Sequence, residues 1–475
     1  MTLFDTDFTL TIDGHSLAGA TGFDVLNPAT EAVIAQAPAA SHAQLNAAVS
    51  AARRAFPDWR DCPIEQRQEA LRKMGLRILD HIDPLTRLLT REHGKPHADA
   101  DRELRAAAYW CAEYAKFTLP EVVTVNTPER RSTTRRVPIG VVGAIAPWNF
   151  PITLSMWKVV AALLSGNTMV LKPSPFTPLT TLKLGELFKD ILPAGVLNVI
   201  SGNDDLGPLM TEHQDIDKIA FTGSTVTGRK IMAGAGKTLK RLTLELGGND
   251  PAIVLPDVDV DQVAKDLFWA AFANTSQICI AVKRLYIHED VYELLANALV
   301  KYAATVKVGD GAEPGTQIGP LQNRQQYERV LHMIKEAHDS GLHFLAGGQV
   351  DGSRPGYFIP VSIVDNPPDD SPVVAEEAFG PLLPLLKFRS IDDVVRRANQ
   401  TIYGLGGSVW SRDLEAALSV AARLDCGTVW INETRFLSPH SAFGGHKQSG
   451  IGVENGAYGL LEYTNTQTTV VKFSV

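Results

Sequence analysis

The sequence predicts an α/β fold in which parallel strands are joined by crossover helices. From Val137 onward, short apolar runs alternate with stretches of helical periodicity, beginning with residues 139–146, 168–171, 196–200 and 218–221. A chain of 475 residues is long enough for about three domains of ordinary size. Such alternation indicates strands that are buried on both faces, and sheets of this kind bind ligands at the carboxyl ends of their strands.

Helices are predicted both before and within this alternation. Ser41 and Gln44 have the spacing of a capping box, after which apolar residues recur at helical intervals. A second helix is expected after Pro63, where apolar residues again fall on one face. Between the strands, the clearest helix covers residues 180–192 and is stopped by Pro193.

A second series of strands and helices begins after the glycine pair 247–248. Its strand candidates are residues 252–255, 284–288, 382–388 and 428–431. The change from the first series of strands and helices to the second, near Glu245, therefore predicts a domain boundary. Two further segments, 122–136 and 462–473, are rich in Thr and Val and are expected to form strands outside both series.

Composition and charge exclude several classes of protein. The chain is 45% hydrophobic and 21% charged, as expected for a soluble globular protein, and its net charge of −8 argues against a nucleic-acid partner. The N-terminus carries acids where a signal peptide would carry bases, and the longest uncharged run is interrupted by prolines, so no membrane segment is predicted. The cysteines form no CxxC motif, which indicates neither disulfides nor a metal site and fits a cytoplasmic location.

Cys279 and Glu245 are the candidate catalytic pair. A lone Cys is more often a buried apolar filler, and most Glu side chains are solvated or ion-paired. Glu245, however, is flanked by leucines and followed by the glycine pair, and Cys279 closes a polar segment that begins at Asn274. A thiolate nucleophile and a carboxylate base together suggest covalent chemistry on a carbonyl.

Further Gly-punctuated polar segments surround this pair, at residues 147–151, 171–174, 221–225, 376–381 and 443–450. In this order and at these separations, the chain resembles the aldehyde dehydrogenase superfamily from end to end. The resemblance implies a modified Rossmann-like dinucleotide-binding domain over residues 1–118 and 137–244. It also implies a second α/β catalytic domain over 245–448, which carries the Cys nucleophile, and a small β oligomerisation element over 119–136 and 460–475.

The strands of that element join subunits in the resembled family, which favours a homodimer or homotetramer; two simple edge strands are the alternative. The resemblance further implies NAD(P)-dependent, non-phosphorylating oxidation of an aldehyde. Cys279 would form a thiohemiacetal whose oxyanion is held by the Asn149 amide and the Cys279 N–H. Hydride transfer would leave a thioester, which water activated by Glu245 would hydrolyse.

A nicotinamide dinucleotide needs its pyrophosphate, riboses and nicotinamide ring held. The segment 221–225 ends a strand and opens a helix, where free N–H groups attract an anion. Lys172 follows a buried strand and can reach ribose hydroxyls. By resemblance, the cofactor residues are Trp148, Lys172, Ser174, Pro175, Gly223, Ser224, Glu377 and Phe379.

The usual GxGxxG fingerprint is absent, as in the resembled family. Pro175 stands where NAD-preferring members commonly have a Glu that accepts from the ribose 2′-hydroxyl and repels a 2′-phosphate. Pro175 can do neither. The resemblance implies NAD as the expected cofactor, and Pro175 predicts that NADP is tolerated.

The substrate residues follow from the same correspondence. An apolar tunnel is expected to be lined by Leu154, Trp157, Ile278, Ile280, Phe436 and Phe443. Arg435 precedes Phe443 and is a candidate to receive a carboxylate tail, as in a semialdehyde, although an exposed Arg is the more common case. The chain departs from the family pattern at Ser276, Val453 and Ala442, where Gly, Arg and Pro are usual. If residue 276 has a positive φ, Ser would store about 1 to 3 kcal/mol of strain.

Two alternatives from other classes stay open. A cofactor-independent cysteine hydrolase or acyltransferase would need a His base, and no His-bearing motif accompanies Cys279. A non-catalytic binding protein on the same fold is the second. Within the family, acyl transfer to coenzyme A or phosphate is a third alternative, against which Glu245 favours hydrolysis.

Overall fold

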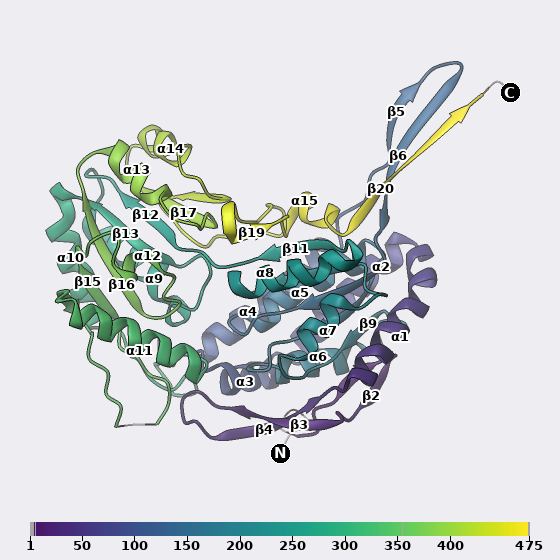
Figure 1. Cartoon of the computed structure of the whole chain (residues 1–475), viewed down its shortest axis with the longest axis horizontal. Helices are drawn as coiled ribbons and strands as arrows, with labels where there is room; N and C mark the ends of the chain where they lie inside the picture. Colours follow the sequence, from purple (N-terminus) through teal and green to yellow (C-terminus); the bar gives the residue numbers. More distant parts are fainter. Residues whose placement is uncertain (1–3, 5, 354, 474–475) are drawn as a thin grey trace.

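The computed structural model describes residues 4, 6–353 and 355–473. The described residues form two large sheets covered by helices, and a β arm that projects from one of them (Figure 1). In that view the sheet from the later part of the chain lies on the left, and the sheet built mostly from the first half lies on the right.

The first sheet has the strand order β19-β11-β10-β7-β8-β9-β1-β2. Its central strands run parallel to one another and are β11 (Arg241–Glu245), β10 (Lys218–Thr222), β7 (Val141–Ile145), β8 (Thr168–Lys172) and β9 (Leu197–Val199). Antiparallel strands flank them, namely β19 (Gly450–Ile451), β1 (Leu10–Ile12) and β2 (His15–Leu17). The four apolar runs predicted from the sequence correspond to β7, β8, β9 and β10, so the predicted strands are confirmed.

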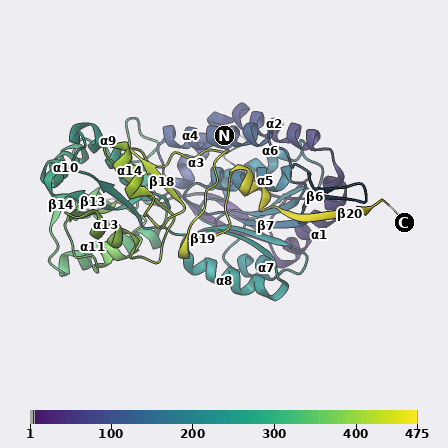
Figure 2. The ribbon, with the colours of Figure 1, turned by 90° about the horizontal axis from the view of Figure 1, so that it is seen from above.

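Helices pack on both faces of this sheet (Figure 2). They are α1 (His42–Asp61), α2 (Ile64–Asp80), α3 (Ile82–His93), α4 (His97–Tyr114), α5 (Pro151–Leu164), α6 (Leu179–Phe188), α7 (Leu206–Glu212) and α8 (Thr225–Ala235). The capping box at the start of α1 is confirmed, since the Ser41 hydroxyl accepts from the Gln44 N–H. The helix predicted over 180–192 ends at Phe188 instead. Pro193 disfavours helical geometry in the residue before it, and residues 189–192 form turns.

The second sheet has the order β14-β15-β16-β13-β12-β17-β18. Its strands are β12 (Asp250–Val254), β13 (Val282–His288), β14 (Phe344–Ala346), β15 (Ser362–Asp365), β16 (Leu382–Phe388), β17 (Gly406–Trp410) and β18 (Thr428–Ile431). The four predicted strands of this series are confirmed, whereas β14, β15 and β17 were not predicted. The chain passes from the first sheet to the second between β11 and β12, directly after Glu245.

Helices also cover this second sheet. They are α9 (Val260–Phe272), α10 (Glu289–Ala303), α11 (Arg324–Asp339), α12 (Pro372–Ala375), α13 (Ile391–Asn399) and α14 (Leu414–Ala421). Two apolar clusters fill its two sides: β12 contributes Ile253 to one and Ala252 and Val254 to the other. This burial on both faces is what the near-continuous apolar strands predicted.

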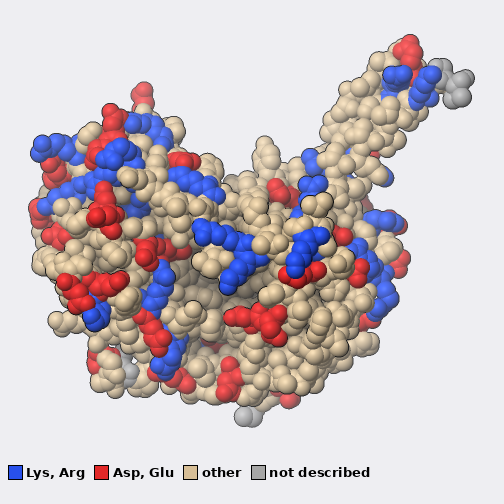
Figure 3. Space-filling model, in the orientation of Figure 1, with Lys and Arg blue, Asp and Glu red and all other residues tan. Residues whose placement is uncertain are grey.

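The arm is a three-stranded antiparallel sheet of β20 (Thr464–Lys472), β6 (Arg130–Pro138) and β5 (Val122–Asn126). Both segments that were expected to form strands outside the two series therefore do so. Figure 3 shows mostly uncharged surface along the arm, with charged residues at its tip. Several valines stand exposed on it: Val122, Val123, Val125, Val470 and Val471.

Among the described residues, no helix is both long and apolar enough to span a membrane. A two-stranded sheet of β3 (Thr21–Leu26) and β4 (Val33–Ala39) and the short helix α15 (Gly456–Leu461) complete the main elements.

Candidate active site

The predicted site residues of the first sheet meet at its carboxyl edge. Lys172 ends β8 and Glu245 ends β11, while the turn that carries Asn149 follows β7. The registers pair Ile145 with Lys172, and Thr222 with Glu245. Because these strands are parallel, the side chains and turns that follow them lie along one edge of the sheet.

The loop that carries Cys279 docks onto this edge from the second sheet. It follows α9, and the Asn149 Nδ2 donates to the Gln277 carbonyl at 2.8 Å. In return, the Asn274 Nδ2 donates to the Asn149 carbonyl at 3.3 Å. Since an amide NH₂ has two hydrogens, Asn149 keeps one for a further acceptor. The structure thus brings together Asn149 and Cys279, which the sequence separates by 130 positions.

The backbone before Cys279 is strained. Asn274, Thr275 and Ser276 have consecutive positive φ values of 51°, 58° and 59°. Ser276 therefore meets the condition under which its side chain would add strain beside the nucleophile. Buried hydrogen bonds hold this conformation: the Gln277 Nε2 donates to the Asn274 carbonyl at 2.9 Å, and the Thr275 hydroxyl donates to the Gly319 carbonyl at 2.9 Å. Strain of this kind persists only where the surroundings determine the backbone.

Burial raises the pKa of the Cys279 thiol to about 12. The positive charge of Lys283 opposes this rise, and the nearby carboxyls of Asp250, Glu245 and Glu377 add to it. The thiolate is the reactive form of Cys, so the resting thiol has to lose its proton before it can attack.

Glu245 is only 3% exposed, and neither carboxyl oxygen has a hydrogen-bond partner within the described part of the chain. Burial holds its pKa well above the usual range, the charge of Glu454 raises it further, and Lys158 opposes both. Lys158 and Glu454 form a buried ion pair of 2.5 Å, and the Lys158 Nζ also donates to the Thr222 hydroxyl at 2.7 Å. A carboxyl with a raised pKa is a stronger base than an ordinary Glu, and its unpartnered oxygens can accept a proton.

The predicted cofactor residues lie along the same edge. Lys172 is buried, its Nζ makes one long hydrogen bond of 3.5 Å to the Pro173 carbonyl, and burial lowers its pKa to about 8. The predicted strand, turn and helix over residues 221–225 are confirmed, because Ser224 caps α8 by accepting from the Thr227 N–H at 3.2 Å. Ser174 accepts from the Phe176 N–H at 3.3 Å, and the Pro175 that follows it is half-buried.

Glu377 and Phe379 reach the edge from the segment between α12 and β16. Glu377 accepts from the Gly248 N–H at 3.1 Å and faces the Lys283 Nζ at 3.3 Å. A Cβ at Gly247 would stand 2.4 Å from the Glu377 carboxylate, so a larger residue there would require the Glu377 side chain to shift. Phe379 has a φ of 49° and packs edge-on against Trp148, with 5.4 Å between the ring centroids.

A family model for the aldehyde dehydrogenase family matches residues 16–469 of the chain. The chain belongs to the aldehyde dehydrogenase family. It is 44% identical to a "Probable aldehyde dehydrogenase" of Pseudomonas sp, covering 98% of this chain and 95% of that protein. It is 38% identical to the phenylacetaldehyde dehydrogenase of Pseudomonas fluorescens, covering 95% of this chain and 92% of that one.

Solved structures similar to this chain are also aldehyde dehydrogenases. An aldehyde dehydrogenase from Bacillus cereus in complex with NAD+ superposes with a TM-score of 0.96 at 38% identity, covering 99% of this chain and 98% of that chain. A betaine aldehyde dehydrogenase from Staphylococcus aureus in complex with NAD+ gives 0.94 at 30% identity, with 98% and 97% coverage.

In this aldehyde dehydrogenase, the predicted substrate residues fall into two groups. Most of them are buried, and Trp157 contacts Phe443 with ring centroids 5.9 Å apart; the buried residues are Leu154, Trp157, Ile278, Ile280 and Phe443. Phe436 is 65% exposed, and the structure does not bring it into that group. Arg435 has a φ of 62°, and its buried Nε has no hydrogen-bond partner among the described residues.

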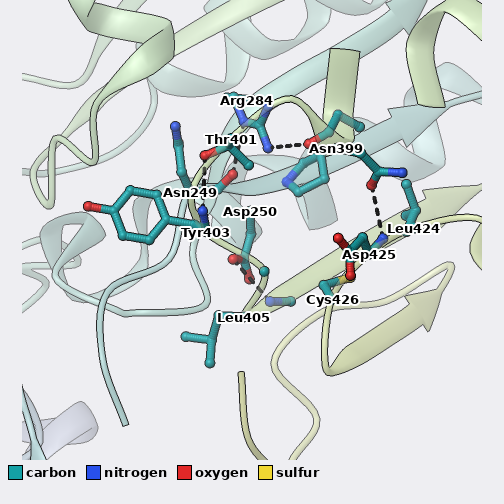
Figure 4. Close-up of a pocket in the computed structure, with 14 residues that line it drawn as sticks. Asn249, Asp250, Arg284, Asn399, Thr401, Tyr403, Leu405, Leu424, Asp425 and Cys426 are labelled. Atoms are coloured by element: carbon teal, nitrogen blue, oxygen red, sulfur yellow. Dashed lines mark hydrogen bonds between the residues drawn. The ribbon is translucent and has the colours of Figure 1, made fainter. Parts of the chain in front are cut away.

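Sequence reasoning missed the buried charged groups that surround Glu245 and Cys279. Lys158 lies in the otherwise apolar helix α5, and a charge in such a setting is the signal that could have singled it out. Its partner Glu454 is 296 positions away, so no local pattern could have paired the two. Asp250 and Lys283 were missed as well. Asp250 borders a pocket with Arg284 that contains none of the three catalytic candidates (Figure 4).

Replacing Ser276 with Gly should stabilise the protein by up to about 1 kcal/mol. Glycine adopts a positive φ without the steric cost that Ser bears, although its greater freedom in the unfolded chain offsets part of the gain. Denaturant unfolding of Ser276→Gly measures the change, with Ser276→Ala as the control that keeps the Cβ. A Ser276→Gly variant that is less stable than Ser276→Ala would show that position 276 is unstrained.

Replacing Glu454 with Gln should shift the acidic limb of the pH profile for thioester hydrolysis to lower pH. The change removes the negative charge of Glu454, which raises the Glu245 pKa, and keeps the opposing charge of Lys158, so the Glu245 pKa falls. Glu245 then stays deprotonated, and active as a base, at lower pH. The measurement is the pH dependence of single-turnover thioester breakdown.

Thr222→Val is the matched control for Glu454→Gln, because it removes a neutral partner of Lys158 and should shift the limb much less. A limb that is unchanged or moves to higher pH in Glu454→Gln would contradict this electrostatic account. The variant is also expected to be less stable, since it leaves Lys158 buried without a charged partner.

Proposed function

We propose that the protein oxidises an aldehyde to a carboxylic acid with reduction of NAD. The observation that carries the proposal is the docking of the Cys279 loop against Asn149, through the 2.8 Å bond from Asn149 to the Gln277 carbonyl. This contact joins the loop of the proposed nucleophile to the proposed oxyanion donor, and the proposed base Glu245 ends β11 at the same edge of the sheet. Family membership and neighbours solved with NAD+ support the same reaction class.

The residues at this edge fit a dinucleotide. Lys172 has spare donors, Glu377 has acceptor capacity, and the N-terminus of α8 offers N–H groups to a pyrophosphate. NAD supplies a hydride acceptor when it is bound. The residues that we propose to hold it are Trp148, Lys172, Ser174, Pro175, Gly223, Ser224, Glu377 and Phe379.

The first chemical task of the protein is to stabilise an oxyanion. Attack of the Cys279 sulfur on the aldehyde carbon, with loss of the thiol proton, gives a thiohemiacetal whose oxygen becomes negative. The remaining Asn149 amide hydrogen and the Cys279 N–H are the proposed donors. One such donor typically contributes about 10²- to 10³-fold in rate.

Glu245 is the proposed base for the second task, release of the acyl group from sulfur. Its oxygens have no partner within the described part of the chain, so they can accept a proton from water. General-base catalysis of this kind is typically worth about 10²- to 10⁴-fold. Transfer of the acyl group to water gives the carboxylic acid and returns the Cys279 thiol.

The function is tested by adding NAD and a panel of aldehydes and following reduced-nicotinamide absorbance together with the acid product. We expect both to appear in equal amounts with the wild-type protein and to be absent with Cys279→Ala. Ester hydrolysis without any NAD-dependent oxidation would favour a cysteine hydrolase. A coenzyme A thioester formed in place of the acid would favour acyl transfer.

Replacing Pro175 with Glu should raise the preference for NAD over NADP. The new carboxylate can accept from the ribose 2′-hydroxyl and repels a 2′-phosphate, so the ratio of kcat/KM values should increase about tenfold or more. Pro175→Gln, which can accept a hydrogen bond without a charge, should change the ratio less. An unchanged ratio in Pro175→Glu would mean that position 175 does not face the ribose.

Arg435 is the proposed site for a carboxylate tail. The proposed apolar path toward Cys279 is lined by the buried substrate residues alone, without the exposed Phe436; they are Leu154, Trp157, Ile278, Ile280 and Phe443. A buried guanidinium nitrogen without a partner is costly, and a bound carboxylate would satisfy it. Arg435→Ala should raise KM for a semialdehyde about tenfold and spare a neutral aldehyde of the same length. Equal effects on the two substrates would dismiss an anion-binding role.

The division into units is also a proposal. We assign cofactor binding to residues 1–118 and 137–244, catalysis to 245–448, and oligomerisation to 119–136 and 460–475, as a homodimer or homotetramer. The exposed valines of the arm support the last assignment, because an apolar strand surface is normally covered by a partner. Four free cysteines support a reducing, cytoplasmic location.

A further inference from the structure

The Lys283 side chain contacts the backbone of the proposed nucleophile, Cys279. Lys283 is the second residue of β13, and its side chain is 5% exposed. The Nζ donates to the Ile278 carbonyl at 2.9 Å and to the Cys279 carbonyl at 2.7 Å, and it faces the Glu377 carboxylate at 3.3 Å. These three contacts account for the three hydrogens of the ammonium group.

The contact to Ile278 determines the direction of a neighbouring donor. The Ile278 carbonyl and the Cys279 N–H belong to one peptide group, which is planar and trans, so the N–H points away from the carbonyl oxygen. A charged donor that fixes this oxygen therefore fixes the N–H as well. The same contact polarises the peptide and makes the N–H a stronger donor. Within the described residues, the Cys279 N–H has no partner and is available to a ligand.

The charges around the Cys279 thiol also indicate a role for Lys283. Three carboxyl groups, those of Asp250, Glu245 and Glu377, raise the Cys279 pKa, and Lys283 is the group that opposes them. Asp250 is itself buried, accepts from the Gly406 N–H at 3.1 Å, and borders the pocket of Figure 4. A neutral residue at 283 would leave these carboxyls facing the thiol without a compensating charge.

We propose that Lys283 is a positioning residue, which orients and polarises the Cys279 peptide for oxyanion binding and ties it to Glu377. The inference rests on the proposed function for the role of that peptide. Its contact with Glu377 links the nucleophile loop to a carboxylate that is proposed to hold the cofactor. Removing Lys283 should therefore affect the acylation step more than the binding of aldehyde.

The test compares Lys283→Met, which keeps the length of the side chain, with Lys283→Arg, which keeps its charge. In Lys283→Met we expect kcat for aldehyde oxidation to fall at least about tenfold, a part of the effect of losing an oxyanion donor, with KM for aldehyde changed less than about threefold. Lys283→Arg should recover most of the loss.

Alkylation of Cys279 by iodoacetamide, without NAD, gives a readout that does not depend on turnover. Its pH profile should move to higher pH in Lys283→Met and return toward wild type in Lys283→Arg. Lys218→Met is the matched control for loss of a buried Lys, because Lys218 begins β10, away from the carboxyl edge, and donates to the Thr243 hydroxyl.

Wild-type kcat and an unchanged alkylation profile in Lys283→Met would overturn the inference. So would losses in Lys283→Met and Lys283→Arg that match those of Lys218→Met in every readout, because a common loss of stability would then explain them. If the wild-type protein alkylates normally but oxidises no aldehyde, the proposed function fails, while the alkylation profiles still test the placement of Lys283.

Discussion

The site depends on one buried polar network that joins the two sheets. Lys95 forms a fully buried ion pair of 2.5 Å with Glu103, and its Nζ donates to the Asn149 carbonyl at 2.9 Å. Glu103 in turn accepts from the Ile152 N–H at 2.8 Å at the start of α5. With both ends of the Asn149 turn held in this way, its side chain can anchor the Cys279 loop. A polar group left unpaired in such a network would cost about 1 to 3 kcal/mol, so the turn has little freedom.

Charge balance is the second feature on which the chemistry depends. Three buried lysines each face a glutamate around the site, in the pairs Lys95–Glu103, Lys158–Glu454 and Lys283–Glu377. Each pair offsets the cost of removing its partner from water, and removing one member would leave an uncompensated charge. Glu245 stands among them without a partner in the described part of the chain, and burial together with the charge of Glu454 raises its pKa. The protein thus neutralises the surrounding charges and leaves the proposed base free to take a proton.

Structural features that depend on residues close together in the chain could be predicted from the sequence. The strands of the first sheet, the Ser41 cap and the strand-to-helix turn over 221–225 follow from local patterns, and the polar segments indicated the family. Other features depend on residues far apart in the chain and could not be predicted. The Lys158–Glu454 pair spans 296 positions, and Lys283 has the sequence context of an ordinary strand lysine. The early end of α6 reflects turns that hydrophobic periodicity does not reveal.

The central claim is that an acyl group bonds to the Cys279 sulfur and leaves with the help of Glu245. Mass spectrometry of Glu245→Gln, mixed with NAD and an aldehyde and then quenched, tests it most directly. We predict that the peptide containing Cys279 gains the mass of the acyl group and that the adduct persists longer than in the wild type. An adduct on another cysteine, or oxidation of the aldehyde with no adduct at any time, would contradict the account.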